Sequence, residues 1–229
     1  FIGLRYSFSR KRNRFTSVIA LVSMLGMVLG VTSLIVVLSV MNGFSDELRG
    51  RILSLVPHGF VEAEQGSLDD WQGLAAQLLT VDGVVAVSPY ITDNVILANG
   101  RSLQGGVLTA IDPVLEGSVS KIPQAMIHGD LATLDKHAFS VVLGASLARM
   151  IGVSVGDKVE VTVPRLTVTP VGVFPRSKRL TVTGLFQVGA QPDGYQAFVS
   201  LRTGQKLLGE RGMVDGLQVK TRDLYGAPA

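Results

Sequence analysis

The chain has no cysteine, so it cannot form disulfide bonds or offer thiolate ligands to a metal. Its three histidines, His58, His128 and His137, stand alone rather than at the spacing of a metal site. The chain also lacks the G-x-x-x-x-G-K-[ST] loop that cradles the phosphates of ATP. We therefore expect no catalytic residues, metal or cofactor in this chain, and no enzyme activity of its own.

Charged side chains are missing from the whole stretch between Phe15 and Ser45, and no acid occurs before Asp46. Five cations precede this stretch: Arg5, Arg10, Lys11, Arg12 and Arg14. About 20 apolar residues in a helix cross the core of a bilayer, and the flank rich in Lys and Arg stays in the cytoplasm. The sequence predicts a cytoplasmic segment 1–14, a transmembrane helix 15–45 and an exported domain 46–229.

A cleaved secretory signal is the alternative interpretation of this apolar stretch. Such signals have an apolar region of roughly 7–15 residues followed by a cleavage site with small residues. The stretch here is longer, and the residues from Val40 to Phe44 have no A-x-A pattern, which favours a membrane helix.

Small residues recur along one face of the predicted membrane helix: Ser23, Gly26, Gly30 and Ser33. Small side chains let two helix backbones approach closely in a membrane, and the two glycines form a G-x-x-x-G pattern. The face predicts a partner helix, although glycine is also simply common in membrane helices.

The net charge of +3 is unevenly distributed. Without the five leading cations, 16 basic residues remain against 18 acidic ones, so the exported part is slightly acidic. The basic character of the whole chain therefore reflects membrane orientation, and we expect no nucleic-acid partner.

The exported part has the pattern of an α+β domain, with strands in runs and few helices. Apolar spacing extends the membrane helix toward Pro57, and Ser67 is a plausible N-cap for a helix with an apolar stripe from Trp71 to Leu79. Asn99-Gly100 predicts a hairpin turn, and Asp112 to Asp135 is loop-like. Two further helices are predicted at Ala145–Ile151 and near Thr203–Leu208. The predicted strands are Phe60–Glu64, Val84–Val87, Val95–Leu97, Ser102–Ile111, Phe139–Leu143, Lys158–Val163, Leu180–Val188, Ala197–Leu201 and Leu217–Lys220.

The segment between two of these strands, 164–179, is unusual because it is both rich in proline and apolar. Prolines 164, 170 and 175 prevent continuous pairing inside a sheet, and Pro170-Val171-Gly172 offers a turn. The pattern predicts a protruding hairpin with an apolar tip and a basic base, which is typical of a binding element. A hairpin folded back on its own core is the alternative.

Several motifs resemble the LolC/LolE-type permease subunits (including the combined LolF-like type) of the lipoprotein-releasing ABC transporter. They are Phe1-Ile2-Gly3-Leu4-Arg5-Tyr6, Val37-Leu38-Ser39-Val40-Met41-Asn42-Gly43-Phe44, Ile111-Asp112-Pro113, Val142-Leu143-Gly144 and Pro192-Asp193-Gly194-Tyr195. The resemblance implies a first membrane helix and a MacB-like periplasmic domain, with three further helices beyond Ala229. It places the domain 46–229 in the periplasm and the protein in the bacterial inner membrane.

The resemblance also implies partners. These are the chaperone LolA, a LolD ATPase that holds ATP and Mg, a second permease subunit, a lipoprotein substrate and the lipid bilayer. It assigns a chaperone-binding hook to Pro164, Leu166, Val168, Pro170, Val171, Gly172, Val173, Phe174 and Pro175, and an adjoining basic pad to Arg176, Lys178 and Arg179. One departure is Glu160, which stands where the family has a basic pad residue; the spacing of the first two hook prolines also differs by one residue.

A path for the lipoprotein's acyl chains is expected at the outer end of the first helix, because such chains need a continuous apolar surface. Its residues are Met41, Phe44, Leu48, Ile52 and Leu55. The same residues could instead pack against a partner subunit. Two other classes share the general plan: a mechanotransmitting permease of the MacB/FtsX type, and a single-pass periplasmic binding protein.

The predicted topology can be tested with reporter fusions placed after residue 60. Because the cations lie before the apolar stretch, we expect only a reporter that works in the periplasm to be active. Activity of a cytoplasmic reporter at this position would contradict the topology.

Overall fold

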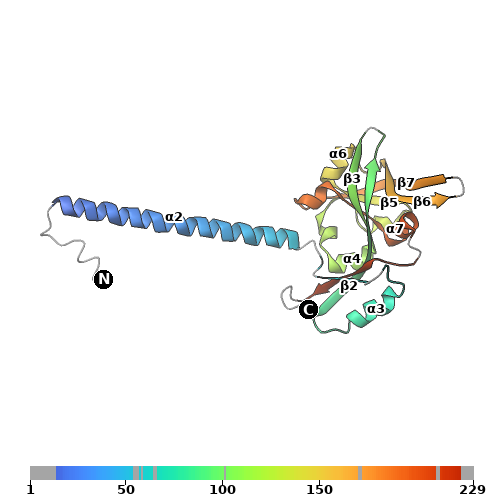
Figure 1. Cartoon of the computed structure of the whole chain (residues 1–229), viewed down its shortest axis with the longest axis horizontal. Helices are drawn as coiled ribbons and strands as arrows, with labels where there is room; N and C mark the ends of the chain where they lie inside the picture. Colours follow the sequence, from blue (N-terminus) through green and yellow to red (C-terminus); the bar gives the residue numbers. More distant parts are fainter. Residues whose placement is uncertain are drawn as a thin grey trace. The chain divides into compact units, whose positions relative to one another are not determined.

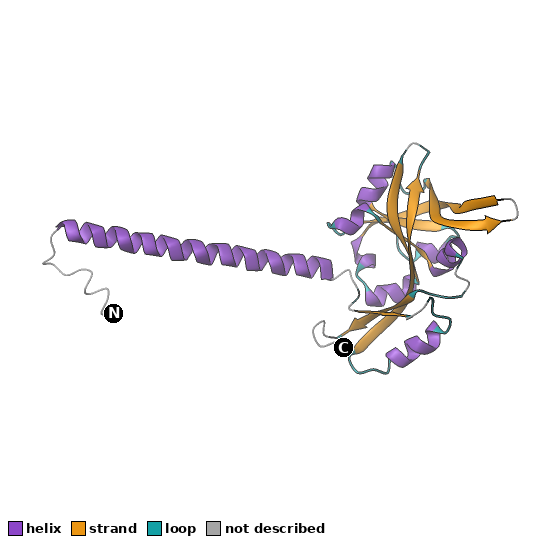
Figure 2. Cartoon of the chain, viewed as in Figure 1, coloured by secondary structure: helices purple, strands orange, loops and turns teal. Residues whose placement is uncertain are grey.

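The computed structural model describes residues 14–53, 57, 59–63, 66–100, 102–169, 172–209 and 212–222. The chain forms two compact units, Phe1–Gly50 and Arg51–Ala229, which we describe separately (Figures 1 and 2).

The described part of the first unit belongs to the long helix α2 (Arg14–Leu53), which ends three residues after Gly50. Its segment Val18–Phe44 is long and apolar enough to cross a membrane, and all of its side chains are exposed in this chain. A helix that is apolar on every side needs lipid or other helices around it. The helix continues past Ser45, as the apolar spacing predicted.

The second unit is built on a nine-stranded mixed sheet in the order β1-β9-β2-β3-β8-β5-β7-β4, with β6 pairing with both β2 and β7. The pairs β3–β8 and β5–β7 are parallel and the others are antiparallel. The strands are β1 (Gly59–Glu62), β2 (Val84–Ala98), β3 (Leu103–Ile111), β4 (Met126–His128), β5 (Ser140–Gly144), β6 (Lys158–Thr169), β7 (Gly172–Phe186), β8 (Gln196–Ser200) and β9 (Gly216–Thr221).

Because β6 bridges β2 and β7, the strands β2, β3, β8, β5, β7 and β6 close into a ring. The main hydrophobic cluster draws fully buried side chains from every strand of this ring: Leu97, Leu108, Val199, Leu143, Leu180 and Val161. The core of the domain therefore lies inside the ring, where closure leaves few free strand edges.

Short helices cover the sheet (Figure 2). They are α3 (Trp71–Leu78), α4 (Pro113–Val119), η1 (Ile122–Ala125), α5 (Thr133–Lys136), α6 (Ala145–Ile151), η2 (Gln191–Gly194) and α7 (Leu201–Leu208). A second apolar cluster includes Leu131, Leu134, Phe186 and Phe198, and a third lies under α3.

Several predicted elements are confirmed. The Asn99-Gly100 turn joins β2 to β3, and Gly100 has the positive φ of +59° that such turns require. Helix α6 spans the predicted residues and ends at Gly152, whose φ of +77° is a left-handed cap that glycine adopts without steric cost.

The predicted N-cap at Ser67 is wrong. The cap of α3 is Asp70, whose Oδ1 accepts a hydrogen bond from the Gly73 amide at 3.1 Å. Leu68 instead forms an isolated antiparallel bridge with Val214, ahead of the helix. Leu79, predicted to belong to the buried stripe, follows the helix and is 52% exposed.

The prediction of a loop from Asp112 to Asp135 is also wrong. Asp112 caps α4 by accepting hydrogen bonds from the amides of Val114 and Leu115, and Pro113 occupies the first helical position. Proline at that position starts a helix well, because its missing N–H would have had no partner there.

Strand β2 is one continuous strand, whereas the sequence predicted two short ones. Pro89 lies within this strand and pairs only with Leu217 of β9, since pairing with β3 begins at the next residue, Tyr90. A proline is tolerated where one side of a strand has no neighbour.

Gly204 in α7 provides a test of this packing. A β-carbon there would overlap the β-carbon of Ala110 on β3. Alanine normally stabilises a helix interior by about 1 kcal/mol over glycine, but overpacking between two rigid elements costs about 1–3 kcal/mol. We expect Gly204→Ala to lower the free energy of unfolding.

The measurement is a urea titration of the detergent-solubilised chain, followed by the fluorescence of its single tryptophan, Trp71. The control is Gly105→Ala, because a β-carbon at this exposed position on β3 meets nothing within 4 Å. A stabilising effect of Gly204→Ala would contradict the packing.

Candidate functional site

The hairpin of β6 and β7 extends beyond the ring (Figure 1). The two strands pair from Lys158↔Thr181 out to Thr169↔Gly172. The pairing of β6 with β2 stops at Thr162, and that of β7 with β5 starts at Thr181. The distal strands therefore pair only with each other, which confirms the predicted protruding hairpin.

The flanks of the hairpin are exposed at Pro164, Arg165 and every residue from Pro175 to Arg179. For these described residues the folded-back alternative is wrong. Pro164 lies within the irregularity between Val163 and Leu166, and Pro175 pairs with Leu166. The other predicted hook residues Val168, Gly172, Val173 and Phe174 lie on the two strands, while Pro170 and Val171 lie outside the described residues.

An ion pair fastens the hairpin to the ring. Arg165 Nε lies 2.9 Å from Asp93 Oδ2 on β2. Extending the β2–β6 register by three residues places these two residues opposite each other, so the pair continues the contact where backbone pairing ends. The arginine is 60% exposed, so the pair contributes at most about 1 kcal/mol. Sequence reasoning missed it because the two residues are far apart in the chain.

The predicted pad residues lie on both faces of β7. Arg176 pairs with Val163 and Lys178 with Val161, so these two cations share the face of two buried valines. Side chains alternate along a strand, and Arg179 therefore lies on the opposite face.

Glu160 lies on that opposite face, directly across from Arg179. It also accepts a hydrogen bond from the Ser177 hydroxyl at 2.6 Å. The departure from the family pattern thus places an acid directly beside a pad cation.

Helix α7 adds positive charge next to the face of β7 that carries Arg176. A groove of about 420 Å³ is lined by Arg176, Arg202, Gln205, Lys206 and Gly209. The Arg176 guanidinium lies against Gly209 at the C-terminal end of α7, where the helix dipole favours a cation. Sequence reasoning missed Arg202 and Lys206, although their i, i+4 spacing on a predicted helix indicates a shared face.

The predicted helix-packing residues lie along α2, and a β-carbon at Gly26 or Gly30 would meet nothing within 4 Å in this chain. Of the predicted lipid path, Met41 and Phe44 are exposed on α2, and Leu48 and Ile52 belong to the same helix. Leu55 lies outside the described residues. The roles of these residues remain predictions.

Comparison with known families decides the classification. Residues 20–225 match the model of the MacB-like periplasmic core domain. The chain belongs to this family. The mixed α/β fold with one N-terminal apolar helix agrees with it, as the sequence predicted.

Among curated relatives, the chain is 39% identical over its full length to the lipoprotein-releasing system transmembrane protein LolC of Neisseria meningitidis, of which it covers 55%. It is 39% identical to LolC of Xylella fastidiosa over 97% of this chain and 54% of that protein. LolE of Haemophilus influenzae is 28% identical over 99% of this chain and 56% of that protein. The resemblance to LolC and LolE is confirmed, and the chain spans about half the length of these relatives.

The register at the base of the hairpin can be tested with engineered cysteines, because the chain has none of its own. Thr162 and Ser177 are opposite each other, so we expect Thr162→Cys with Ser177→Cys to form a disulfide on mild oxidation. Thiol counting and electrophoretic mobility without reductant measure it.

The matched control is Thr162→Cys with Lys178→Cys, whose side chains lie on opposite faces of the hairpin. Equal oxidation of both pairs would show that the strands are not held in this register.

Proposed function

We propose that this chain is the first membrane helix and periplasmic domain of a LolC-type permease subunit. The complete protein belongs to an ABC transporter that extracts lipoproteins from the inner membrane and passes them to LolA. The observation that carries the proposal is the free hairpin of β6 and β7 in a chain with LolC relatives.

The hairpin has the physical properties of a docking element. A two-stranded hairpin is only marginally stable alone, and this one is supported at its base by the ring and by the Arg165–Asp93 pair. Its sequence between the prolines is apolar, and an apolar segment at a protruding tip favours contact with a partner. A chaperone that carries acyl chains offers a complementary apolar cavity.

The cations at the base of the hairpin orient the approaching chaperone. Arg176, Lys178 and Arg179 are exposed, and charges at the rim of an interface act on the rate of encounter more than on final affinity. Because Glu160 offsets Arg179, we expect the face with Arg176 and Lys178 to dominate this steering.

The remaining parts of the transporter lie outside this chain. In the proposed assembly, LolD holds ATP and Mg and hydrolyses the nucleotide in the cytoplasm. A second permease subunit packs on the small-residue face of α2, and the acyl chains of the cargo move along the outer end of that helix from Met41 to Leu55.

The match to the MacB-like family is also compatible with an alternative function, that of a mechanotransmitting permease for a different cargo. The hairpin distinguishes the two, since the alternative has no need of a chaperone contact there.

The decisive experiment is a pull-down of LolA with the detergent-solubilised chain. Burial of an aromatic side chain contributes about 1.5–3 kcal/mol, so we expect Phe174→Asp to abolish binding. The control is Leu103→Asp, because Leu103 is a large apolar residue that is 65% exposed beside the other hairpin turn. Lys178→Glu with Arg179→Glu should weaken binding most at low salt.

Two results would refute the proposal. One is wild-type LolA binding by a folded Phe174→Asp chain. The other is loss of the domain's fold in this variant with LolA binding that follows folding alone, since the hairpin would then belong to the core.

A further inference from the structure

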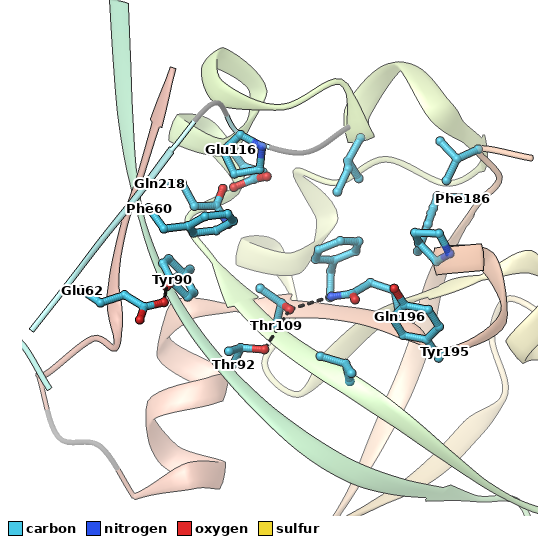
Figure 3. Close-up of a pocket in the computed structure, with 16 residues that line it drawn as sticks. Phe60, Glu62, Tyr90, Thr92, Thr109, Glu116, Phe186, Tyr195, Gln196 and Gln218 are labelled. Carbon is cyan, nitrogen blue, oxygen red and sulfur yellow. Dashed lines mark hydrogen bonds between the residues drawn. The ribbon is translucent and has the colours of Figure 1, made fainter. Parts of the chain in front are cut away.

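A cavity of about 380 Å³ opens in the periplasmic unit, away from the hairpin (Figure 3). One wall comes from β1, β9, β2 and α4, and the other from β3, β8 and β7. Its volume lies in the range of small-molecule sites. Five aromatic side chains line it: Phe60, Tyr90, Phe186, Tyr195 and Phe198.

The charge of this lining has one sign. It contains two carboxyl groups, Glu62 and Glu116, and no Lys, Arg or His among the described residues that line it. Glu62 is exposed, whereas Glu116 on α4 is only 2% exposed. The cavity therefore has an acid in its exposed part and a second acid in its interior.

Glu116 is buried, and no cation among the described residues that line the cavity balances it. Burial raises the pKa of Glu116, and the hydroxyls of Ser120 and Ser88 lower it in part. Lys220 on β9 directs its Nζ to the Ser118 carbonyl at 2.9 Å. A buried carboxyl group is stabilised by an opposite charge, so this environment favours a cationic ligand.

Gln218 supplies an independent indication. Its side chain is 7% exposed, and its Oε1 is buried without a hydrogen-bond partner in the described part of the chain. Figure 3 shows this amide beside Glu116 and Phe60. An unsatisfied buried acceptor is costly, and a ligand with an N–H group would satisfy it.

The aromatic rings suit the same kind of ligand. Phe60 and Tyr90 pack edge to face, with ring centroids 5.5 Å apart, and the Tyr90 hydroxyl donates to Glu62 Oε1 at 2.6 Å. Phe60 is 50% exposed, so part of its ring is open to solvent. Aromatic faces attract cations, and most strongly where water is excluded.

We propose that this cavity binds a small organic cation with an apolar body. Its charged N–H group contacts Glu116 and Gln218, and its body lies against the aromatic walls. A neutral apolar molecule would leave Gln218 Oε1 without a hydrogen-bond partner and Glu116 without a balancing charge, and an anion would be repelled. The site is separate from the hairpin and does not depend on the function proposed above.

Three probes with the same body test the proposal: 4-phenylbutylamine, 4-phenylbutanol and 4-phenylbutyrate. Their binding to the full chain in lipid nanodiscs is measured by calorimetry, with empty nanodiscs as the blank. We expect saturable binding of the amine, binding of the alcohol weaker by about tenfold or more, and no binding of the carboxylate. Glu116→Gln should weaken binding of the amine by about tenfold. Asp69→Asn, which removes an exposed carboxylate outside the cavity, should leave binding of the amine unchanged.

If Glu116→Gln does not fold, Glu62→Gln takes its place. Glu62 is exposed, and a glutamine there can still accept the hydrogen bond from the Tyr90 hydroxyl. Loss of its charge should weaken binding of the amine about threefold. Equal binding of amine and alcohol would overturn the proposal, since the cavity would then be only apolar. Binding of the carboxylate as tight as that of the amine, absence of saturable amine binding, or an equal loss in Asp69→Asn would overturn it as well.

Discussion

The pairing of β6 with two neighbours, β2 and β7, is the contact on which the rest of the domain depends. Only three residue pairs join β6 to β2, from Ile96↔Thr162 to Ala98↔Glu160, yet they close the ring that contains the main core. The next residues of β6 are Val163 and Pro164. Proline has no N–H to offer a neighbouring strand, so the ring contact ends here and the two strands continue as a free hairpin.

In this arrangement the main core and the protruding hairpin are separate. The side chains that stabilise the domain point into the ring, while the hairpin beyond Pro164 pairs only with itself. The same geometry places the base of the hairpin beside α7, which adds Arg202 and Lys206 to the cations on β7.

The sequence predicted much of this domain where local chemistry decides the structure. Gly100 and Gly152 both occupy positions that need a positive φ, and the structure has a turn and a helix end there. The proline-rich segment was correctly predicted as a protruding hairpin. Local signals misled at Asp112, where the glycines and prolines around it masked the start of a helix. The sequence also divided β2 into two strands, and its continuity through Pro89 depends on which side of the strand has a neighbour.

By itself the sequence determined the apolar helix, its expected orientation, the family and the residues of the hairpin. Hydropathy, charge and turn formation depend on residues that are close together in the chain. Only the tertiary structure decided which residues meet. Arg165 reaches Asp93, Glu160 faces Arg179, and Glu116 shares a cavity with Gln218. These neighbours come from strands and helices distant in the chain, so their contacts depend on the register of the sheet. A slip of one residue would turn the side chains of a strand to its opposite face.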